Sequence, residues 1–141
     1  MKLLPCALLL ASCAAPPDHG DPSAVLEPHG FYAWEVSSLI SAADEWNARW
    51  GSSLSVAEHG NVQVFAHHWP NDVGIVGSTE LHDGAWSIQL ESDTERKIFY
   101  EAALHEIGHY LTGGSHSANP ADVMFWRYEG QSHLTDADVS R

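Results

Sequence analysis

The side chains best suited to chemistry are gathered in residues 105–109, which read HEIGH. In a helix, the four-residue spacing of His105 and His109 places both imidazoles one turn apart on the same face, where they can bind one metal ion. Glu106 lies beside them but is offset around the helix, so its carboxylate can reach a metal-activated water without becoming a ligand. The pattern therefore predicts a hydrolytic zinc site, and the alternative is a helix with two surface histidines.

A third metal ligand is expected from the residues that follow this helix. Gly113 and Gly114 permit a sharp turn, and His116 comes directly behind that turn. Both cysteines of the chain lie in its first 13 residues, so the metal must be held by His, Asp or Glu. His116 is the candidate; if it is an exposed loop residue instead, His133 or Asp122 could take its place.

The spacing of apolar residues predicts two helices that flank a sheet. The first helix covers residues 31–50 and ends at Gly51. The second begins after Ser92, which forms a capping-box pattern with Glu95, and ends before Gly113. Alternating apolar positions predict strands at residues 61–67, 73–79 and 85–90.

Residues 1–12 have the layout of a secretory signal peptide. A basic residue precedes an apolar run at residues 3–10, which is too short to span a bilayer. Residues 10–13, LASC, resemble the lipobox of bacterial lipoprotein precursors, in which the cysteine, here Cys13, becomes the lipid-bearing first residue. The alternative is an ordinary signal peptide cleaved a few residues later, near Ala14 or Ala15. We therefore expect an exported lipoprotein, periplasmic or on the cell surface and anchored to a membrane, or a secreted protein if Cys13 is not lipidated.

Residues 13–30 indicate a stiff tether, because they contain four prolines and few large apolar groups. We expect the catalytic domain to occupy residues 31–141 as a single unit and to be monomeric. The formal net charge of -13 argues against nucleic acid as a partner and is compatible with binding of hard cations such as calcium.

Residues 105–117, HEIGHYLTGGSHS, resemble the zinc-binding motif of the matrixin type of metzincin protease. In that motif a glycine turn, a third His and a Ser follow His-Glu-x-Gly-His. Residues 119–124, NPADVM, are similar to the family's Met turn, which would place Met124 beneath the histidines. Gly113 and His116 each come one residue later than in the family pattern, and one inserted residue that lengthens the helix explains both shifts.

The resemblance implies an α+β fold of the matrixin-like zincin type. This fold has a twisted, mostly parallel sheet, an early helix, an active-site helix and a short C-terminal helix. Residues 43–47 and 134–139 resemble, more weakly, the first and the last of these helices.

The same resemblance implies a zinc-dependent endopeptidase that acts on proteins or peptides. His105, His109 and His116 would hold the catalytic zinc, Glu106 would be the general base, and no covalent nucleophile would be needed. The competing hypothesis is a catalytically silent zinc-binding surface lipoprotein for adhesion or metal storage. Glu106 favours the enzyme, because a purely structural zinc site gains nothing from a base beside it.

In the family, the substrate lies extended along an edge strand upstream of the zinc helix, where it is added as a further strand. The matching residues, assigned to substrate binding, are Gly74, Ile75, Val76 and Gly77. Matrixins often have a second, structural metal as well, such as Ca²⁺. The residues that could supply such a site include His67, His68, His82 and the neighbouring Asp83.

Overall fold

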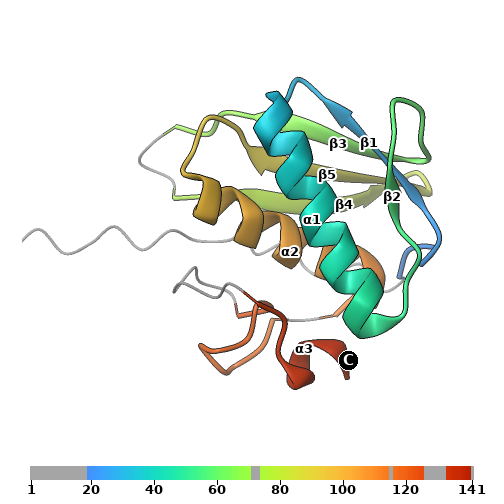
Figure 1. Ribbon diagram of the computed structural model, residues 1–141, viewed down its shortest axis with the longest axis vertical. Helices are drawn as coiled ribbons and strands as arrows, with labels where there is room; N and C mark the ends of the chain where they lie inside the picture. Colours follow the sequence, from blue (N-terminus) through green and yellow to red (C-terminus); the bar gives the residue numbers. More distant parts are fainter. Residues whose placement is uncertain (1–18, 71–73, 115, 126–132, 141) are drawn as a thin grey trace, which may run out of the picture.

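The chain folds into a five-stranded sheet with two long helices in front of it (Figure 1). The computed structural model describes residues 19–70, 74–114, 116–125 and 133–140. In chain order the elements are β1 (Val25–His29), α1 (Ala33–Trp50), β2 (Ser55–Val56), β3 (Val62–His67), β4 (Gly77–His82), β5 (Ala85–Glu91), α2 (Arg96–Thr112) and α3 (Asp136–Val139). The predicted α+β fold is confirmed, including the early helix, the active-site helix and the short C-terminal helix.

The strands lie in the order β2-β1-β3-β5-β4, and all neighbours are parallel except the last pair. β4 runs antiparallel to β5 because a two-residue turn joins them. Asp83 and Gly84 have φ values of 50° and 79° in this turn, the left-handed conformation that a tight hairpin needs. The hairpin places β4 at the edge of the described sheet, on the side of α2.

Two of the three predicted strands are confirmed as β3 and β5, whereas the third begins later than expected. The strand predicted at residues 73–79 starts at Gly77, which pairs with Leu90. Gly74 has a φ of 66°, and this left-handed conformation bends the chain before the ladder begins.

The expected tether boundary near Phe31 is wrong, because the residues before it already belong to the domain. β1 lies inside the sheet, with Leu26 fully buried. β2 pairs only with the first two residues of β1, so β1 has no partner strand on that side at Pro28. The missing N–H of Pro28 therefore costs no hydrogen bond to β2. Further upstream, the N–H of Gly20 donates to the carbonyl of Tyr110 at 2.6 Å. The remaining positions of the predicted tether, residues 13–18, and the signal peptide lie outside the described residues.

A buried carboxylate joins the start of α1 to the β5–α2 connection. Glu35 is fully buried and accepts hydrogen bonds from the N–H groups of Tyr32 and Asp93, both at 2.8 Å. It also accepts from the hydroxyl of Ser92 at 2.9 Å. The expected capping box of Ser92 is therefore wrong: this hydroxyl serves α1, and α2 begins at Arg96 with Glu95 as its N-cap.

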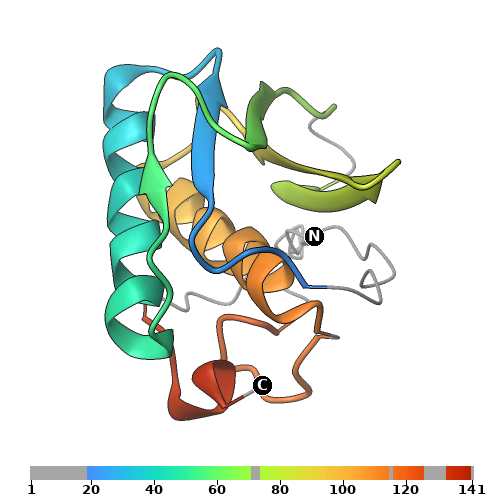
Figure 2. The same cartoon turned by 90° about the vertical axis from the view of Figure 1, so that its right-hand side faces the viewer.

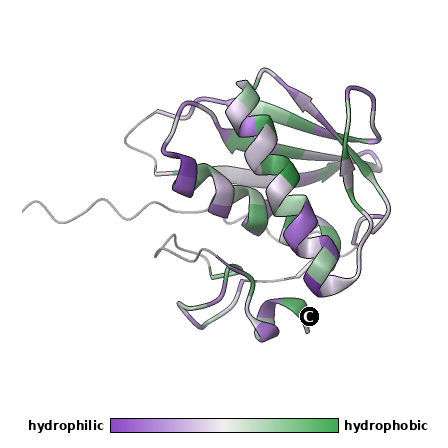
Figure 3. Cartoon of the chain, in the orientation of Figure 1, coloured by the Kyte–Doolittle hydropathy of each residue, from purple (hydrophilic) through white to green (hydrophobic). Residues whose placement is uncertain are grey.

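The hydrophobic core lies between the sheet and the two helices, and Figure 3 shows apolar residues along the central strands. Trp46 of α1 is fully buried, and its indole N–H donates to the carbonyl of Leu104 in α2 at 2.8 Å. Figure 2 shows the two helices from the side, where α2 runs between α1 and the sheet edge. Among the described residues, no helix combines the length and apolar character needed to cross a membrane.

Candidate active site

Residues 105–109 lie in the C-terminal half of α2, as predicted. His105 and Glu106 are fully buried and His109 is nearly so, because α2 is covered by α1, β4, β5 and the loops that follow it. The helix ends at Gly113, whose φ of 56° is left-handed and whose N–H donates to the carbonyl of His109. The surface-helix alternative is therefore excluded, since the histidines face the interior.

The turn after α2 brings the third histidine to the other two. One ring nitrogen from each of His105, His109 and His116 can be chosen so that all three atoms lie within 4.8 Å of one another. The Nε2 atoms of His109 and His116 are 3.2 Å apart. The extra residue is absorbed as expected: α2 continues to Thr112, and the turn at Gly113 then returns the chain.

Backbone carbonyls fix which nitrogen faces the centre in two of the three rings, those of His105 and His109. Nδ1 of His105 lies 2.6 Å from the carbonyl oxygen of Val123, and Nδ1 of His109 lies 3.1 Å from that of Gly114. A carbonyl oxygen only accepts hydrogen bonds, so each Nδ1 carries the proton. The neutral rings then direct the lone pair of Nε2 to the centre of the group, which is the arrangement of zinc-binding histidines.

The separation of the His109 and His116 nitrogens also fits zinc. Zinc binds histidine nitrogens at about 2.0–2.1 Å in a tetrahedron, so two ligand atoms on one ion should be about 3.3 Å apart. The 3.2 Å between His109 and His116 agrees with this value, and the three ligand atoms as a group lie within 4.8 Å of one another. Three imidazoles occupy three of the four tetrahedral positions and leave the fourth for water or substrate. This ligand set is that of a catalytic rather than a structural zinc site.

Met124 packs against α2 through contact with Gly108, which lies between His105 and His109 in the sequence. Its side chain is fully buried. A Cβ on Gly108 would lie 2.3 Å from the sulfur of Met124 and 2.8 Å from the ring of Trp46, so only glycine allows this approach. The Met turn is thus pressed against the helix between its two histidines.

α3 holds the Met turn in place through Asp138. This buried carboxylate accepts hydrogen bonds from the N–H groups of Val123 and Met124, both at 3.0 Å, and from that of Thr135 at 2.9 Å. Because the carbonyl of Val123 in turn orients His105, α3 supports the metal site from a distance. Sequence reasoning did not single out Asp138, although it lies in the segment that resembles the last family helix.

Glu106 lies beside the histidines and points at β4. The hydroxyl of Thr79 lies 2.6 Å from its Oε2. Burial raises the pKa of the Glu106 carboxyl, and the hydrogen bond from Thr79 offsets part of this rise, so that the pKa is about 8. A dication held by the neighbouring histidines would favour the carboxylate form. Thr79 was not identified from the sequence either, because no sequence pattern around this residue relates it to residues 105–109.

The substitute ligands considered from the sequence are engaged elsewhere. Asp122 accepts hydrogen bonds from Ser117 at 2.5 Å and Thr135 at 2.8 Å, and His133 lies 3.7 Å from Glu45. Within the described ranges, no second group of three or more His, Cys, Asp or Glu residues could share a metal. Of the acidic residues that the structure describes, only Asp83 forms an ion pair with His82, at 3.5 Å. A structural calcium site stays a prediction.

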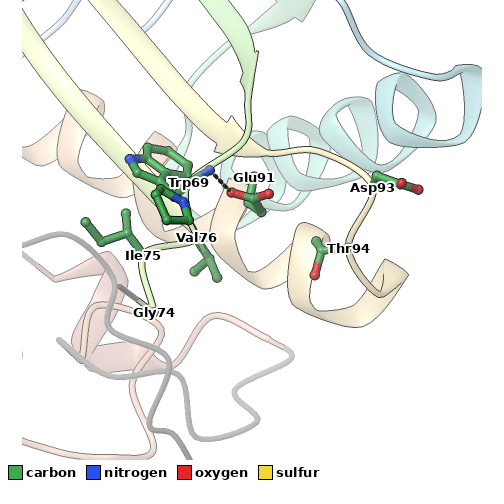
Figure 4. Close-up of a pocket in the computed structure, with 8 residues that line it drawn as sticks. Trp69, Gly74, Ile75, Val76, Glu91, Asp93 and Thr94 are labelled. Carbon is green, nitrogen blue, oxygen red and sulfur yellow. Dashed lines mark hydrogen bonds between the residues drawn. The ribbon is translucent and has the colours of Figure 1, made fainter. Parts of the chain in front are cut away.

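Three of the four residues assigned to substrate binding line one pocket, shown in Figure 4. Its volume is about 170 Å³, and its lining consists of Trp69, Pro70, Gly74, Ile75, Val76, Glu91, Asp93 and Thr94. Glu91 closes one wall by accepting a hydrogen bond from the N–H of Trp69 at 2.8 Å. The fourth assigned residue, Gly77, lies against Glu106 instead.

Comparison with known proteins identifies the family. The profile of matrixin, a family of M10 peptidases, matches residues 46–141, which include the whole histidine group. The chain belongs to the matrixin family. This matrixin is a zinc-dependent metalloendopeptidase, with its histidine triad intact.

Solved structures show the same fold at low sequence identity. Two structures of myroilysin are each 11% identical to this matrixin. For one of them the TM-score is 0.63, and the alignment covers 95% of this chain and 88% of the myroilysin chain. For the other the TM-score is 0.59, and the alignment covers 83% of this chain and 76% of the myroilysin chain. A search of curated proteins found no match.

Removal of the Asp138 carboxylate should weaken zinc binding without touching a ligand. We expect Asp138→Ala to lower zinc affinity about 10–100-fold, as loss of an outer-shell partner does, since the Val123 carbonyl would no longer be held against His105. Competition with a chromogenic zinc chelator measures this. Asp136→Ala is the matched control: Asp136 is exposed on the same helix, and its only ion pair among the described residues is with Arg49. Unchanged affinity in Asp138→Ala would contradict the proposed support.

Loss of the third imidazole should abolish tight zinc binding. We expect His116→Ala to lower zinc affinity by more than about 100-fold, because loss of a direct ligand exceeds the cost of losing an outer-shell partner. His133→Ala serves as the control, because this exposed histidine lies outside the triad. Metal analysis after dialysis gives the zinc content. If His116→Ala kept one zinc per chain, the assignment of the third ligand would be incorrect.

Proposed function

We propose that this matrixin cleaves internal peptide bonds of extended protein segments outside the cytoplasmic membrane, with Glu106 as the general base. The observation that carries the proposal is a fully buried carboxylate next to three converging imidazoles. When bound there, zinc acts as a Lewis acid that polarises a carbonyl and lowers the pKa of water. Such a site hydrolyses amides without a covalent nucleophile.

The two oxygens of Glu106 have different surroundings, which suits proton transfer. Oε2 is held by Thr79, whereas buried Oε1 has no hydrogen-bond partner among the described residues. Oε1 is therefore the atom that would take a proton from the attacking water as the new C–O bond forms. The same proton then passes to the nitrogen of the breaking C–N bond, so that the amine leaves neutral.

β4 is the proposed docking strand for the substrate backbone. It lies at the edge of the described sheet, with β5 on one side, so an extended peptide can add to its other side. β4 also carries Thr79 and Gly77, which contact the proposed base. A peptide on this strand would therefore pass close to Glu106, and the pocket at Gly74, Ile75 and Val76 would receive one of its side chains. Backbone pairing gives modest selectivity for sequence.

Anchoring by a lipid on Cys13 is proposed from the sequence alone. Cys13 lies outside the described residues, and the support is the LASC segment after an apolar run. A lipid on this residue would hold the catalytic domain close to a membrane surface, on its periplasmic or extracellular side. The enzyme would then act on proteins that pass near the membrane.

Glu106→Gln tests the proposed base. The amide keeps the shape of the side chain but cannot take up the proton, so kcat on an unfolded protein substrate should fall about 10²–10⁴-fold with zinc retained. Glu58→Gln is the control, because Glu58 is exposed. Full activity of Glu106→Gln with one zinc per chain would show that the mechanism is wrong. A wild-type protein that binds zinc and cleaves no substrate would instead support the silent zinc-binding alternative.

Cys13→Ser tests the anchor. Cells grown with a labelled fatty acid should label the wild-type protein and place it in the membrane fraction, whereas Cys13→Ser should carry no label. Cys6→Ser is the control, because Cys6 lies in the expected signal peptide and should not affect the labelling. Equal labelling of wild type and Cys13→Ser would exclude lipidation at this residue.

A further inference from the structure

Thr79 of β4 forms a hydrogen bond between the sheet edge and the reactive helix. This side chain is 2% exposed, and its hydroxyl lies 2.6 Å from Oε2 of Glu106 and 2.9 Å from the carbonyl oxygen of the same residue. A hydroxyl in this place can donate its single proton to the carboxylate. The length of this hydrogen bond, 2.6 Å, lies in the range of hydrogen bonds from a hydroxyl to an ionised carboxylate.

Gly77, two residues earlier on the same face of β4, provides the space for the carboxylate. A Cβ on Gly77 would lie 2.7 Å from Cγ and 2.8 Å from Oε1 of Glu106. Real Cβ atoms do not approach other heavy atoms so closely, so any larger residue would push the carboxylate away. The Glu106 side chain is therefore confined by β4 on one side and held by a hydrogen bond at its tip.

We propose that Thr79 is a positioning residue for Glu106, and that it selects Oε1 as the oxygen that receives the proton. The inference rests on the proposed role of Glu106 as the base. A glutamate has three rotatable side-chain bonds, and its terminal torsion is broad. The Thr79 hydroxyl restricts that torsion by fixing Oε2, and Oε1 is left for the water. Threonine suits this task because its branched Cβ limits rotation of its own hydroxyl.

The placement of Thr79 also links substrate binding to the base. The same strand that is proposed to pair with the substrate backbone carries the group that orients Glu106. Distance and angle between the scissile bond and Oε1 are thus set by one rigid element. Such pre-organisation raises kcat rather than lowering KM, because it acts on the reacting geometry.

A second hydroxyl–carboxylate pair in the chain provides a matched control. Ser92 donates to the buried Glu35 at 2.9 Å, and Ser92 is a buried residue as Thr79 is. This pair joins α1 to the β5–α2 connection and does not involve the triad. Loss of either hydroxyl should therefore destabilise the fold to a similar degree, but only loss at Thr79 should affect catalysis.

The experiment compares Thr79→Val, Thr79→Ser and Ser92→Ala as zinc-loaded full-length enzymes with one peptide substrate. We expect Thr79→Val to lower kcat about 10–100-fold, the range for loss of an orienting partner, with KM changed less than about 3-fold and one zinc per chain. Thr79→Ser keeps the hydroxyl and should retain kcat within about 3-fold of wild type. Ser92→Ala should lower the melting temperature and leave kcat unchanged. If Thr79→Val does not fold, Thr79→Ala replaces it.

The inference is overturned if Thr79→Val keeps the kcat of wild type, or if Thr79→Ser loses as much as Thr79→Val, since packing alone would then explain the site. Loss of zinc in Thr79→Val would overturn it as well. Glu106→Gln in the same assay separates the two proposals. An active Glu106→Gln contradicts the base itself, whereas an inactive Glu106→Gln with a fully active Thr79→Val contradicts only the role of Thr79.

Discussion

The hydrogen bond from Nδ1 of His105 to the carbonyl oxygen of Val123 connects the reactive helix to the loop beneath it. It fixes the tautomer and the rotation of the first ligand, which the helix alone cannot do. The carbonyl is itself held, because Asp138 binds the N–H groups of Val123 and Met124. The metal site is therefore assembled from α2, the Met turn and α3 together, and its geometry depends on the least regular part of the chain.

Three of the buried carboxylates, Glu35, Asp138 and Glu106, show how a supporting carboxylate differs from a reactive one. Glu35 and Asp138 each accept several hydrogen bonds from backbone N–H groups and hydroxyls, so both oxygens are used. Glu106 is equally buried, yet Thr79 engages only its Oε2. A buried carboxylate with an oxygen outside any hydrogen bond is destabilising, and such groups are concentrated at functional sites. Glu106 differs from the two supporting carboxylates in this respect, and it alone of the three directly adjoins a histidine of the triad in sequence.

Local sequence signals failed where a distant contact decided the structure. Proline content indicated a tether before Phe31, but burial of Leu26 and pairing with β3 draw β1 into the sheet. Ser92 and Glu95 formed a helix-start pattern, but the hydroxyl of Ser92 is used by Glu35, far away in sequence. Both signals depend only on residues that are close together in the sequence. The contacts that decide the structure join segments that are far apart in the sequence.

The sequence by itself determined the reactive groups and the elements that carry them. The spacing of His105 and His109, the offset of Glu106 and the glycine turn before His116 follow from helix geometry, which is set by neighbouring residues. Only the tertiary structure decided that Val123 orients His105, that Asp138 holds the Met turn and that Thr79 meets Glu106. These contacts depend on how α2, β4 and α3 pack, and packing is a property of the whole chain rather than of any local pattern.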